Sequence, residues 1–310
     1  MKFWIGSAIF LALAVGVALT VKNEYVFFAS FVILQFIVLA TAWNILGGYA
    51  GYVNFGTSAF FGIGVYTAVF LLRWIGAPLY LQIAAAAVVG AALGLGIGLL
   101  TLRLRGIFFS IATVAITIIA ETLITNWKFV GGATGVQLLR PEVTWPFDSY
   151  IKMLFVVAAV MVVIAVALAR YVQESKLGRG LRAVRDDEIA TETSGVPTLN
   201  LKLIACALSG ALMCAAGAPS AMYLQFADPV SAFNLNYSVS ALAMSLIGGT
   251  LHWIGPVVGA ILLGSTQQLL TVTISSEANV LVLGVMLVLF VVVAPQGIIG
   301  LAKRLMGRRP

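Results

Sequence analysis

Charged side chains are scarce in this sequence. Only 9% of its 310 residues are Asp, Glu, Lys or Arg, whereas 61% are hydrophobic. A water-soluble domain covers its surface with roughly a quarter charged residues, so a soluble fold is excluded. The 18 basic residues exceed the 11 acidic residues and give a formal net charge of +7. Because the bases stand between long apolar runs, this excess indicates membrane topology rather than nucleic-acid binding.

Groups for catalysis and metal binding are also few. The chain has one histidine, His252, and two cysteines, Cys206 and Cys214, which are spaced too far along one predicted helix to pair. The segment 131–135 lacks the Gly-Lys-Ser/Thr of a phosphate-binding loop. Glu121 is the one acidic residue inside a predicted span, which argues against a proton-coupled pump. We expect no enzyme activity, no metal and no bound cofactor, and any ATP is hydrolysed by another chain.

Long runs without charge define the fold class. Tyr25–Leu72 and Pro229–Ser276 contain 48 residues each, and a helix crosses the hydrocarbon with about 20, so each run holds two crossings. An open sheet leaves backbone groups unpaired in lipid, and a barrel requires alternation that these runs lack. The sequence predicts a single transmembrane domain, 1–310, an all-α polytopic bundle of ten helices: 3–21, 26–46, 54–72, 78–100, 107–126, 150–171, 201–225, 237–249, 254–274 and 279–300.

The distribution of bases sets the expected orientation. Residues 1–21 form a retained first span, since no cleavage site precedes Lys22. With a cytoplasmic N-terminus and ten crossings, five bases lie outside and thirteen lie inside: Lys2, Arg103, Arg105, Arg170, Lys176, Arg179, Arg182, Arg185, Lys202, Lys303, Arg304, Arg308 and Arg309. The positive-inside rule favours this arrangement. Nine crossings would place the basic C-terminal tail, 303–310, outside.

Glycines interrupt or mark several predicted helices. Gly47-Gly48, with Gly51 and Gly56, predicts a break in the first 48-residue run, and Gly248-Gly249, with Gly255-Pro256 after it, predicts one in the second. Interrupted membrane helices often line a substrate cavity, although each glycine pair also suits a tight turn. The span 237–249 is short enough to be either a full crossing or a half-helix. By contrast, three glycines spaced four apart on one helix face, Gly90, Gly94 and Gly98, indicate close helix packing.

One polar segment, about 173–200, separates two predicted spans. Its residues 179–194 fit a single helix of about four turns, with Gly195 at its C-terminal cap and Pro197 just beyond. Both charge signs occur along it, which is unlike a helix that lies on lipid. Two interpretations remain open from composition: docking into a groove of a partner protein, or a solvated loop whose arginines only fix topology.

Four stretches in order carry a family resemblance: Trp43–Gly51 with Asn54–Tyr66; Gly178–Gly195; Ser238–Gly249 with Gly255–Ala260; and Ala294–Ile298. The chain resembles the membrane permease subunit of bacterial ABC importers of the branched-chain amino acid type, the LivH/LivM family, and is closer to the LivM branch. Two positions depart from many relatives, which have a histidine in place of Thr57 and a basic residue in place of Gln296.

The resemblance implies an ABC importer permease fold in the bacterial inner membrane, with both termini cytoplasmic. The implied partners are a second, LivH-like permease, two ATP-binding-cassette subunits that use ATP and Mg, and a periplasmic binding protein. The polar segment would be the coupling helix that seats in the ATPase subunit. The family's helix matches onto Arg182, Arg185, Asp186, Asp187, Glu188 and Gly195.

Branched-chain amino acids are zwitterions with apolar side chains, so a path of backbone dipoles, small residues and amides suits them. The candidates are Asn44, Asn54, Thr57, Ser58, Ser245, Gly248 and Gly249. For each polar one, an interhelical hydrogen bond is the competing interpretation. Within the family, urea or short amides remain alternative substrates. A secondary transporter would more often show intramembrane charges or an internal repeat, and a scaffolding protein would need neither broken helices nor a docking segment.

Overall fold

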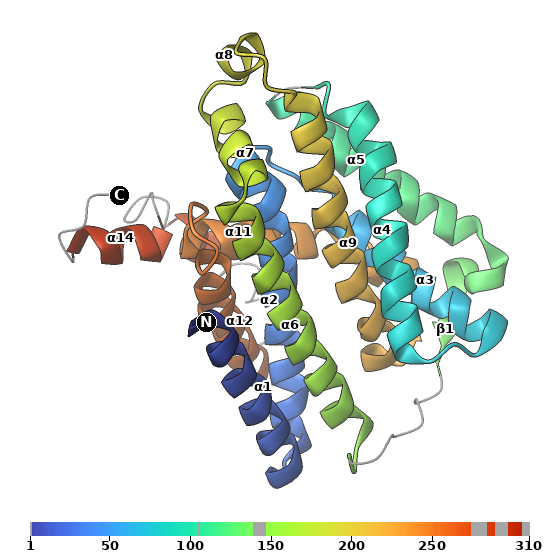
Figure 1. Ribbon diagram of the computed structural model, residues 1–310. Coiled ribbons are helices and arrows are strands. Elements are labelled where there is room, and N and C mark those ends of the chain that lie inside the picture. The colour runs from blue at the N-terminus through green and yellow to red at the C-terminus, as the bar shows by residue number, and fades with distance from the viewer. Residues whose placement is uncertain (1, 105, 139–146, 274–283, 289–296, 306–310) are drawn as a thin grey trace.

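The computed structural model describes residues 2–104, 106–138, 147–273, 284–288 and 297–305. The predicted crossing at 279–300 lies mostly outside the described residues, as does most of the basic tail at 303–310. Within the described residues the chain folds into a bundle of long helices, with one two-stranded ladder on its flank (Figure 1).

Eight segments among the described residues are long and apolar enough to cross a membrane. Seven are single helices: α1 (Lys2–Thr20), α2 (Glu24–Ala50), α3 (Thr57–Ile75), α4 (Leu79–Thr101), α5 (Ile107–Asn126), α6 (Tyr150–Glu174) and α9 (Thr198–Leu224). Each coincides with a predicted crossing, so the predicted all-α polytopic fold is confirmed over this part of the chain. The eighth segment, Pro229–Gly248, has a different construction.

That eighth segment consists of two helices, α10 (Pro229–Ala232) and α11 (Asn236–Gly248). The predicted span 237–249 corresponds to α11, whose 13 residues extend about 20 Å, less than the ~30 Å hydrocarbon core. Figure 1 shows α11, in orange behind α6, lying across the long helices rather than alongside them. The chain then returns in α12 (Gly255–Thr273), and α14 (Gly297–Leu305) follows.

Helices α2 and α9 are the most enclosed of the long helices, and most of their residues are buried. Helix α4 packs against α9 through the predicted glycine face. A Cβ at Gly90 would collide with the Gly210 carbonyl, and one at Gly94 would lie 2.7 Å from the Cys206 carbonyl oxygen. Close packing through these glycines is therefore confirmed. Both cysteines are buried and unpaired, as expected.

A short ladder and two turns connect helices at one end of the bundle. The turns η1 (Lys128–Val130) and η2 (Gly132–Thr134) follow α5, and β1 (Val136–Gln137) then pairs antiparallel with β2 (Phe226–Ala227), which follows α9. Val136 stands opposite Ala227. The sequence does not predict this pairing, because two-residue strands have no hydrophobic period to detect.

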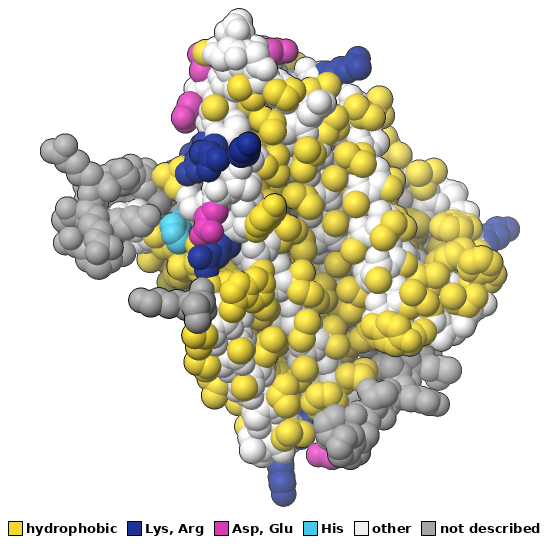
Figure 2. Space-filling model, in the orientation of Figure 1, with side chains coloured by type: hydrophobic (Ala, Val, Ile, Leu, Met, Phe, Trp, Pro, Cys, Tyr) yellow, Lys and Arg dark blue, Asp and Glu magenta, His cyan; other side chains and the backbone are white. Residues whose placement is uncertain are grey.

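The opposite end of the bundle carries the polar segment, which forms α7 (Lys176–Asp186) and α8 (Glu188–Thr193). Hydrophobic side chains cover most of the visible body of the bundle, whereas basic and acidic side chains gather toward this end (Figure 2). The first and the last described helices, α1 and α14, both contact the chain between α11 and α12. The Phe3 ring is 5.6 Å from the Trp253 ring, and Gly297 touches the backbone of Gly249.

Candidate translocation and coupling site

The polar segment is two helices rather than one, so the predicted single helix over 179–194 is wrong. Asp187 has extended backbone angles (φ −157°, ψ 108°), and it both ends α7 and begins α8. Its carboxylate accepts a hydrogen bond from the Ala190 amide at 3.0 Å. Aspartate favours such N-cap geometry over a helix interior, which is why the helix breaks there. The predicted end at Gly195 is confirmed, since Gly195 has φ 84° just beyond α8.

The first break in the long helices is the segment 51–56, between α2 and α3. The predicted break is confirmed at Gly51 and Gly56, but it begins later than Gly47-Gly48, because α2 continues through both of those glycines to Ala50. The Trp43 and Asn44 side chains lie directly over these two glycines, so the glycines make room for side chains within the helix. The chain leaves the helix at Gly51, whose φ of 76° is readily adopted only by glycine.

Side chains from three helices, α2, α5 and α11, and from the break itself satisfy the irregular backbone of the first break. The donors and acceptors lie 2.6–3.0 Å apart: Trp43 Nε1 to Asn54 O, Ser110 Oγ to Val53 O, Phe55 N to Thr113 Oγ1, Ser238 Oγ to Phe55 O, and Gly56 N to Asn54 Oδ1. Non-helical backbone at membrane depth is tolerated only where protein or water supplies such partners. The first break is therefore a built element of the bundle interior.

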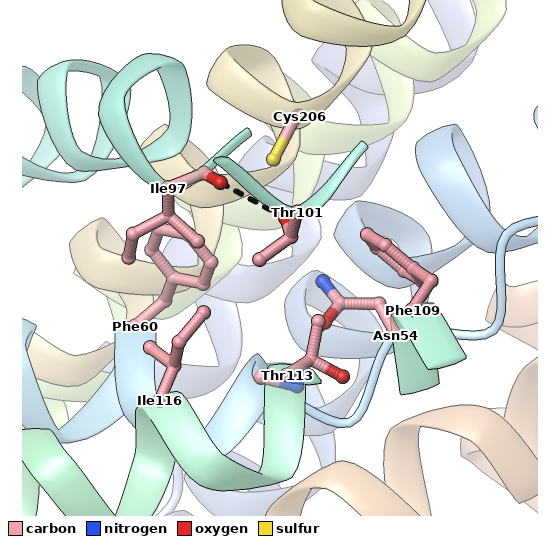
Figure 3. Close-up of a pocket in the computed structure, with 9 residues that line it drawn as sticks. Asn54, Phe60, Ile97, Thr101, Phe109, Thr113, Ile116 and Cys206 are labelled. Atoms are coloured by element: carbon pink, nitrogen blue, oxygen red, sulfur yellow. Dashed lines mark hydrogen bonds between the residues drawn. The ribbon is translucent and has the colours of Figure 1, made fainter. Parts of the chain in front are cut away.

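A small hollow adjoins the first break between α4, α5 and α9. Its lining is mostly apolar and includes Phe60, Ile97, Phe109 and Cys206, and the polar residues Asn54, Thr101 and Thr113 contribute from different sides. Figure 3 shows the amide nitrogen of Asn54 turned toward Thr101 and the hollow. The hydroxyl of Thr101 donates back to the Ile97 carbonyl of its own helix at 2.9 Å, which leaves the Asn54 amide as the polar group presented there.

The second break is the segment 249–254, between α11 and α12, at the predicted Gly248-Gly249. Backbone packing holds it. A Cβ at Gly248 would collide with the Gly255 carbonyl, one at Gly259 would collide with the Met244 carbonyl, and one at Gly297 would collide with Gly249. Three segments of backbone, from α11, α12 and α14, therefore meet without side chains between them. Gly249 has φ 110°, which also restricts this position to glycine.

Helix α7 binds the end of α2 just before the first break, and helix α8 binds the break itself. The Arg185 guanidinium donates to the Gly48 carbonyl at 2.7 Å. On the other side of Gly51, the Tyr52 hydroxyl donates to Glu188 Oε2 at 2.6 Å. Glu188 Oε1 in turn forms an ion pair with Lys202 Nζ at 2.7 Å. The polar segment thus contacts the chain immediately before and immediately after the turn at Gly51.

The second break is connected to the same region through Gln173 near the end of α6. The Trp253 amide donates to Gln173 Oε1 at 2.7 Å, and the Tyr49 hydroxyl lies 3.4 Å from the same oxygen. Arg182 of α7 donates to the Gln173 carbonyl at 3.3 Å. Gln173 therefore joins α2, α7 and the second break.

The predicted coupling residues separate into two groups. Asp186 and Asp187 are exposed, and their surface is open to a partner. Arg182, Arg185 and Glu188 bind other parts of their own chain. The contact of this segment with an ATPase subunit stays a prediction.

The predicted path residues also differ in their surroundings. Both amide atoms of Asn44 and the hydroxyl of Thr57 are buried without a hydrogen-bond partner among the described residues. Ser58 Oγ lies 2.9 Å from Ser238 Oγ, and Ser245 Oγ donates to the Ala40 carbonyl at 2.9 Å. For these two serines, interhelical hydrogen bonds are what the structure shows. Asn54, Gly248 and Gly249 belong to the breaks described above.

Sequence reasoning missed five residues that organise this site: Tyr52, Thr113, Gln173, Lys202 and Ser238. The distribution of charges gives Lys202 only a topological role, yet its side chain is buried and the residue is 2% exposed. The signal available for Thr113 was its helical spacing from Ser110 and Thr117 on one face of α5. Among the described residues, no three His, Cys, Asp or Glu side chains gather as a metal site would require.

Comparisons with known proteins agree with this architecture. Residues 25–291 match the family described as branched-chain amino acid transport system / permease component. The high-affinity branched-chain amino acid transport system permease protein LivM of Escherichia coli K12 is 29% identical over 294 residues, covering 86% of this chain and 68% of LivM. The probable branched-chain amino acid transport permease protein LivH of Methanocaldococcus jannaschii is 26% identical over 267 residues, covering 80% and 82% of the two chains.

A more distant similarity covers less of the chain. The ribose import permease protein RbsC of Escherichia coli K12 is 28% identical over 141 residues, which is 43% of each chain. No solved structure matches this chain. The family match spans most of the sequence and includes both breaks and the polar segment between α6 and α9. The chain is a multi-pass membrane protein that belongs to the permease-component family of branched-chain amino acid transport systems.

Proposed function

We propose that this chain is one of two membrane subunits of an ATP-driven importer of branched-chain amino acids in the bacterial inner membrane. The observation that carries the proposal is the direct contact of the polar segment with the first break, through Glu188 to Tyr52, and with the end of α2 just before it, through Arg185 to Gly48. A partner that displaces α7 and α8 therefore acts on irregular backbone between two membrane helices. Such discontinuous segments are where transporters commonly form their substrate paths.

We assign the proposed partners to the two ends of the bundle, the polar end with α7 and α8 and the opposite end. Two ATPase subunits, which use ATP and Mg, contact the exposed Asp186 and Asp187 side, and the LivM and LivH relatives support this assignment. The thirteen bases that the ten-crossing topology assigns to that side support a cytoplasmic location for it and for both termini. A periplasmic binding protein delivers substrate to the opposite end, and a second, LivH-like permease completes the pore. The chain itself has no ATPase site.

The unpaired polar groups of Asn44 and Thr57 support a path at the inner ends of α2 and α3. A buried polar atom without a partner costs free energy, so it calls for an explanation such as a transient ligand. The Asn44 amide oxygen can accept from a substrate ammonium group, and its nitrogen and the Thr57 hydroxyl can donate to a carboxylate. The apolar surroundings suit an aliphatic side chain.

The substitution Asn44→Leu tests the path. If the Asn44 amide serves no ligand, an apolar side chain of similar size should leave stability equal or higher and leave uptake intact. We expect the thermal midpoint of the purified protein to be maintained while leucine uptake is lost. The control for uptake is Gln82→Leu, on α4 and away from both breaks, which removes another buried oxygen without a partner together with one hydrogen bond to the Ala77 carbonyl. Normal uptake by Asn44→Leu would remove Asn44 from the path.

The substrate and energy source are tested by uptake of labelled leucine, isoleucine, valine and urea. Cells lacking this chain are compared with the same cells carrying it, with and without the ATPase subunits. We expect loss of uptake of the three amino acids and its recovery only when chain and ATPase subunits are both present. Uptake of urea alone would replace the substrate assignment, and uptake without ATPase subunits would indicate a secondary transporter.

A further inference from the structure

Lys202 at the start of α9 is an unusual base for a residue near the membrane surface. It is 2% exposed, whereas a lysine that only sets topology extends its ammonium group into water. Its ammonium donates to Glu188 Oε1 at 2.7 Å, to the Tyr52 hydroxyl at 3.0 Å and to the Leu102 carbonyl at 3.1 Å. The three bonds use all three of its donors, which fixes the group in one position.

Glu188, Lys202 and Tyr52 close into a ring of contacts, which we call the buried triad. The Tyr52 hydroxyl accepts from Lys202 and donates to Glu188 Oε2 at 2.6 Å, and Lys202 Nζ lies 4.7 Å from the centroid of the Tyr52 ring. The side chains of Lys202 and Glu188 are 3% and 15% exposed. Burying an ion pair costs free energy unless good geometry and further hydrogen bonds offset the loss of water. Because these bonds exist only in one arrangement of the three side chains, they hold the segments that carry them in that arrangement.

The triad joins segments that are far apart in the sequence. Glu188 belongs to α8, Lys202 to α9, and Tyr52 to the first break, while the Leu102 carbonyl lies at the end of α4. Glu188 faces inward because the extended backbone at Asp187 separates α8 from α7. A continuous helix over 179–194 would not have this turn.

Tyr52 is also close to the most constrained part of the first break. Two residues beyond it, the Asn54 carbonyl accepts from Trp43 Nε1 at 2.8 Å, and the Phe55 amide donates to Thr113 Oγ1 at 3.0 Å. Before it, Arg185 holds the Gly48 carbonyl. A displacement of α8 would therefore move the Tyr52 hydroxyl, which binds Glu188. Only two peptide units separate Tyr52 from Asn54, which borders the hollow.

We propose that the buried triad transmits movement of α7 and α8 to the first break. In this arrangement Glu188 is a positioning residue that acts through Tyr52 and Lys202, and the ATPase contact falls to the exposed Asp186 and Asp187. The inference rests on the proposed function, since it assumes that an ATPase subunit moves α7 and α8.

The test uses the complete importer, with ATPase subunits and binding protein, in proteoliposomes. Glu188→Leu with Lys202→Met removes the ion pair and leaves no buried charge alone, an exchange that proteins often tolerate. We expect this variant to assemble with the ATPase subunits. We expect leucine transported per ATP hydrolysed to fall roughly tenfold, within the usual range for coupling between two sites. The charge exchange Glu188→Lys with Lys202→Glu should recover part of the ratio.

Tyr52→Phe keeps the test decisive if the double variant does not fold. It removes one hydroxyl and no charge, and we expect a smaller fall in leucine transported per ATP with assembly unchanged. A wild-type ratio in a folded double variant, or in Tyr52→Phe, would overturn the inference. Loss of ATPase binding by the double variant would also overturn it, because Glu188 would then be a partner contact. Failure of the wild-type chain to bind any ATPase subunit would instead refute the proposed function.

Discussion

The two breaks in the membrane helices are held in different ways. In the first, 51–56, side chains from several helices bind the irregular backbone, and Arg185 and Glu188 contact its flanks. In the second, 249–254, glycines bring three backbone segments into contact. Hydrogen bonds can be exchanged for others during a movement, whereas close-packed backbones have no free space to move into. We infer that the first break is the movable part of the site and the second is its fixed support.

The largest effect is expected where the second break admits no added atom. Gly259→Ala places a Cβ against the Met244 carbonyl, and overpacking of this kind costs about 1–3 kcal/mol. We expect a lower thermal midpoint in detergent and a lower yield of folded protein. The matched control is Gly96→Ala on α4, where a Cβ meets nothing within 4 Å. An equal midpoint for the two variants would contradict tight backbone packing at the second break.

A smaller effect on stability and a clear effect on transport are expected at the first break. Ser238→Ala leaves the Phe55 carbonyl and the Ser58 amide without this hydroxyl. A buried donor or acceptor that loses its partner lowers the free energy of unfolding by about 1–3 kcal/mol. Part of this loss is avoided if the backbone of the first break shifts to find another partner. We expect folded protein with reduced leucine uptake.

The control for Ser238→Ala is Ser265→Ala, whose hydroxyl, among the described residues, bonds to the Leu262 carbonyl of its own helix and to no other helix. Uptake by Ser265→Ala should match that of the wild type. If the two serine variants transport leucine equally, the hydrogen bonds of the first break do not contribute to transport.

The smallest effect is expected at the solvent-exposed or lipid-exposed edge of the first break, where Val53 lies. Ser110 Oγ donates to the Val53 carbonyl at 2.8 Å in an exposed position, where another polar group can replace it. We expect Ser110→Ala to change the free energy of unfolding by about 0.5–1.5 kcal/mol, the net worth of one hydrogen bond, and to leave uptake nearly unchanged. A larger loss than in Ser238→Ala would show that the edge, not the buried side, holds the break.

Hydrophobic run length predicted the long helices well, because each crossing needs a fixed number of apolar residues. Gly51 and Gly56 bound the first break as predicted. Its predicted start at Gly47-Gly48 failed, because a glycine pair has the same appearance in a sequence whether it ends a helix or admits side chains such as Trp43 and Asn44. The single helix over 179–194 failed because the cap at Asp187 depends on one side-chain contact, to the Ala190 amide.

For the site, the composition of the sequence indicated which types of polar side chain the chain contains, but not which of these side chains would form contacts with one another. Glu188 and Lys202 are only fourteen residues apart, yet their pairing requires the turn at Asp187 and includes Tyr52, a hundred and fifty residues from Lys202. Contacts of this kind depend on tertiary packing. By contrast, Asn44 and Thr57 could be named from the sequence, because polar side chains within an apolar run next to glycines are conspicuous.

The most direct test of the movable and fixed breaks is a pair of distance measurements in the assembled importer. Spin labels at Val53 and Ile204 report the first break against α9, and labels at Leu251 and Ile261 report the second against α12; all four side chains are exposed. The buried Cys206 and Cys214 are replaced by alanine. On adding ATP, the distance from Val53 to Ile204 should change while the distance from Leu251 to Ile261 stays constant. A change confined to the second pair, or none in the first, would contradict the account.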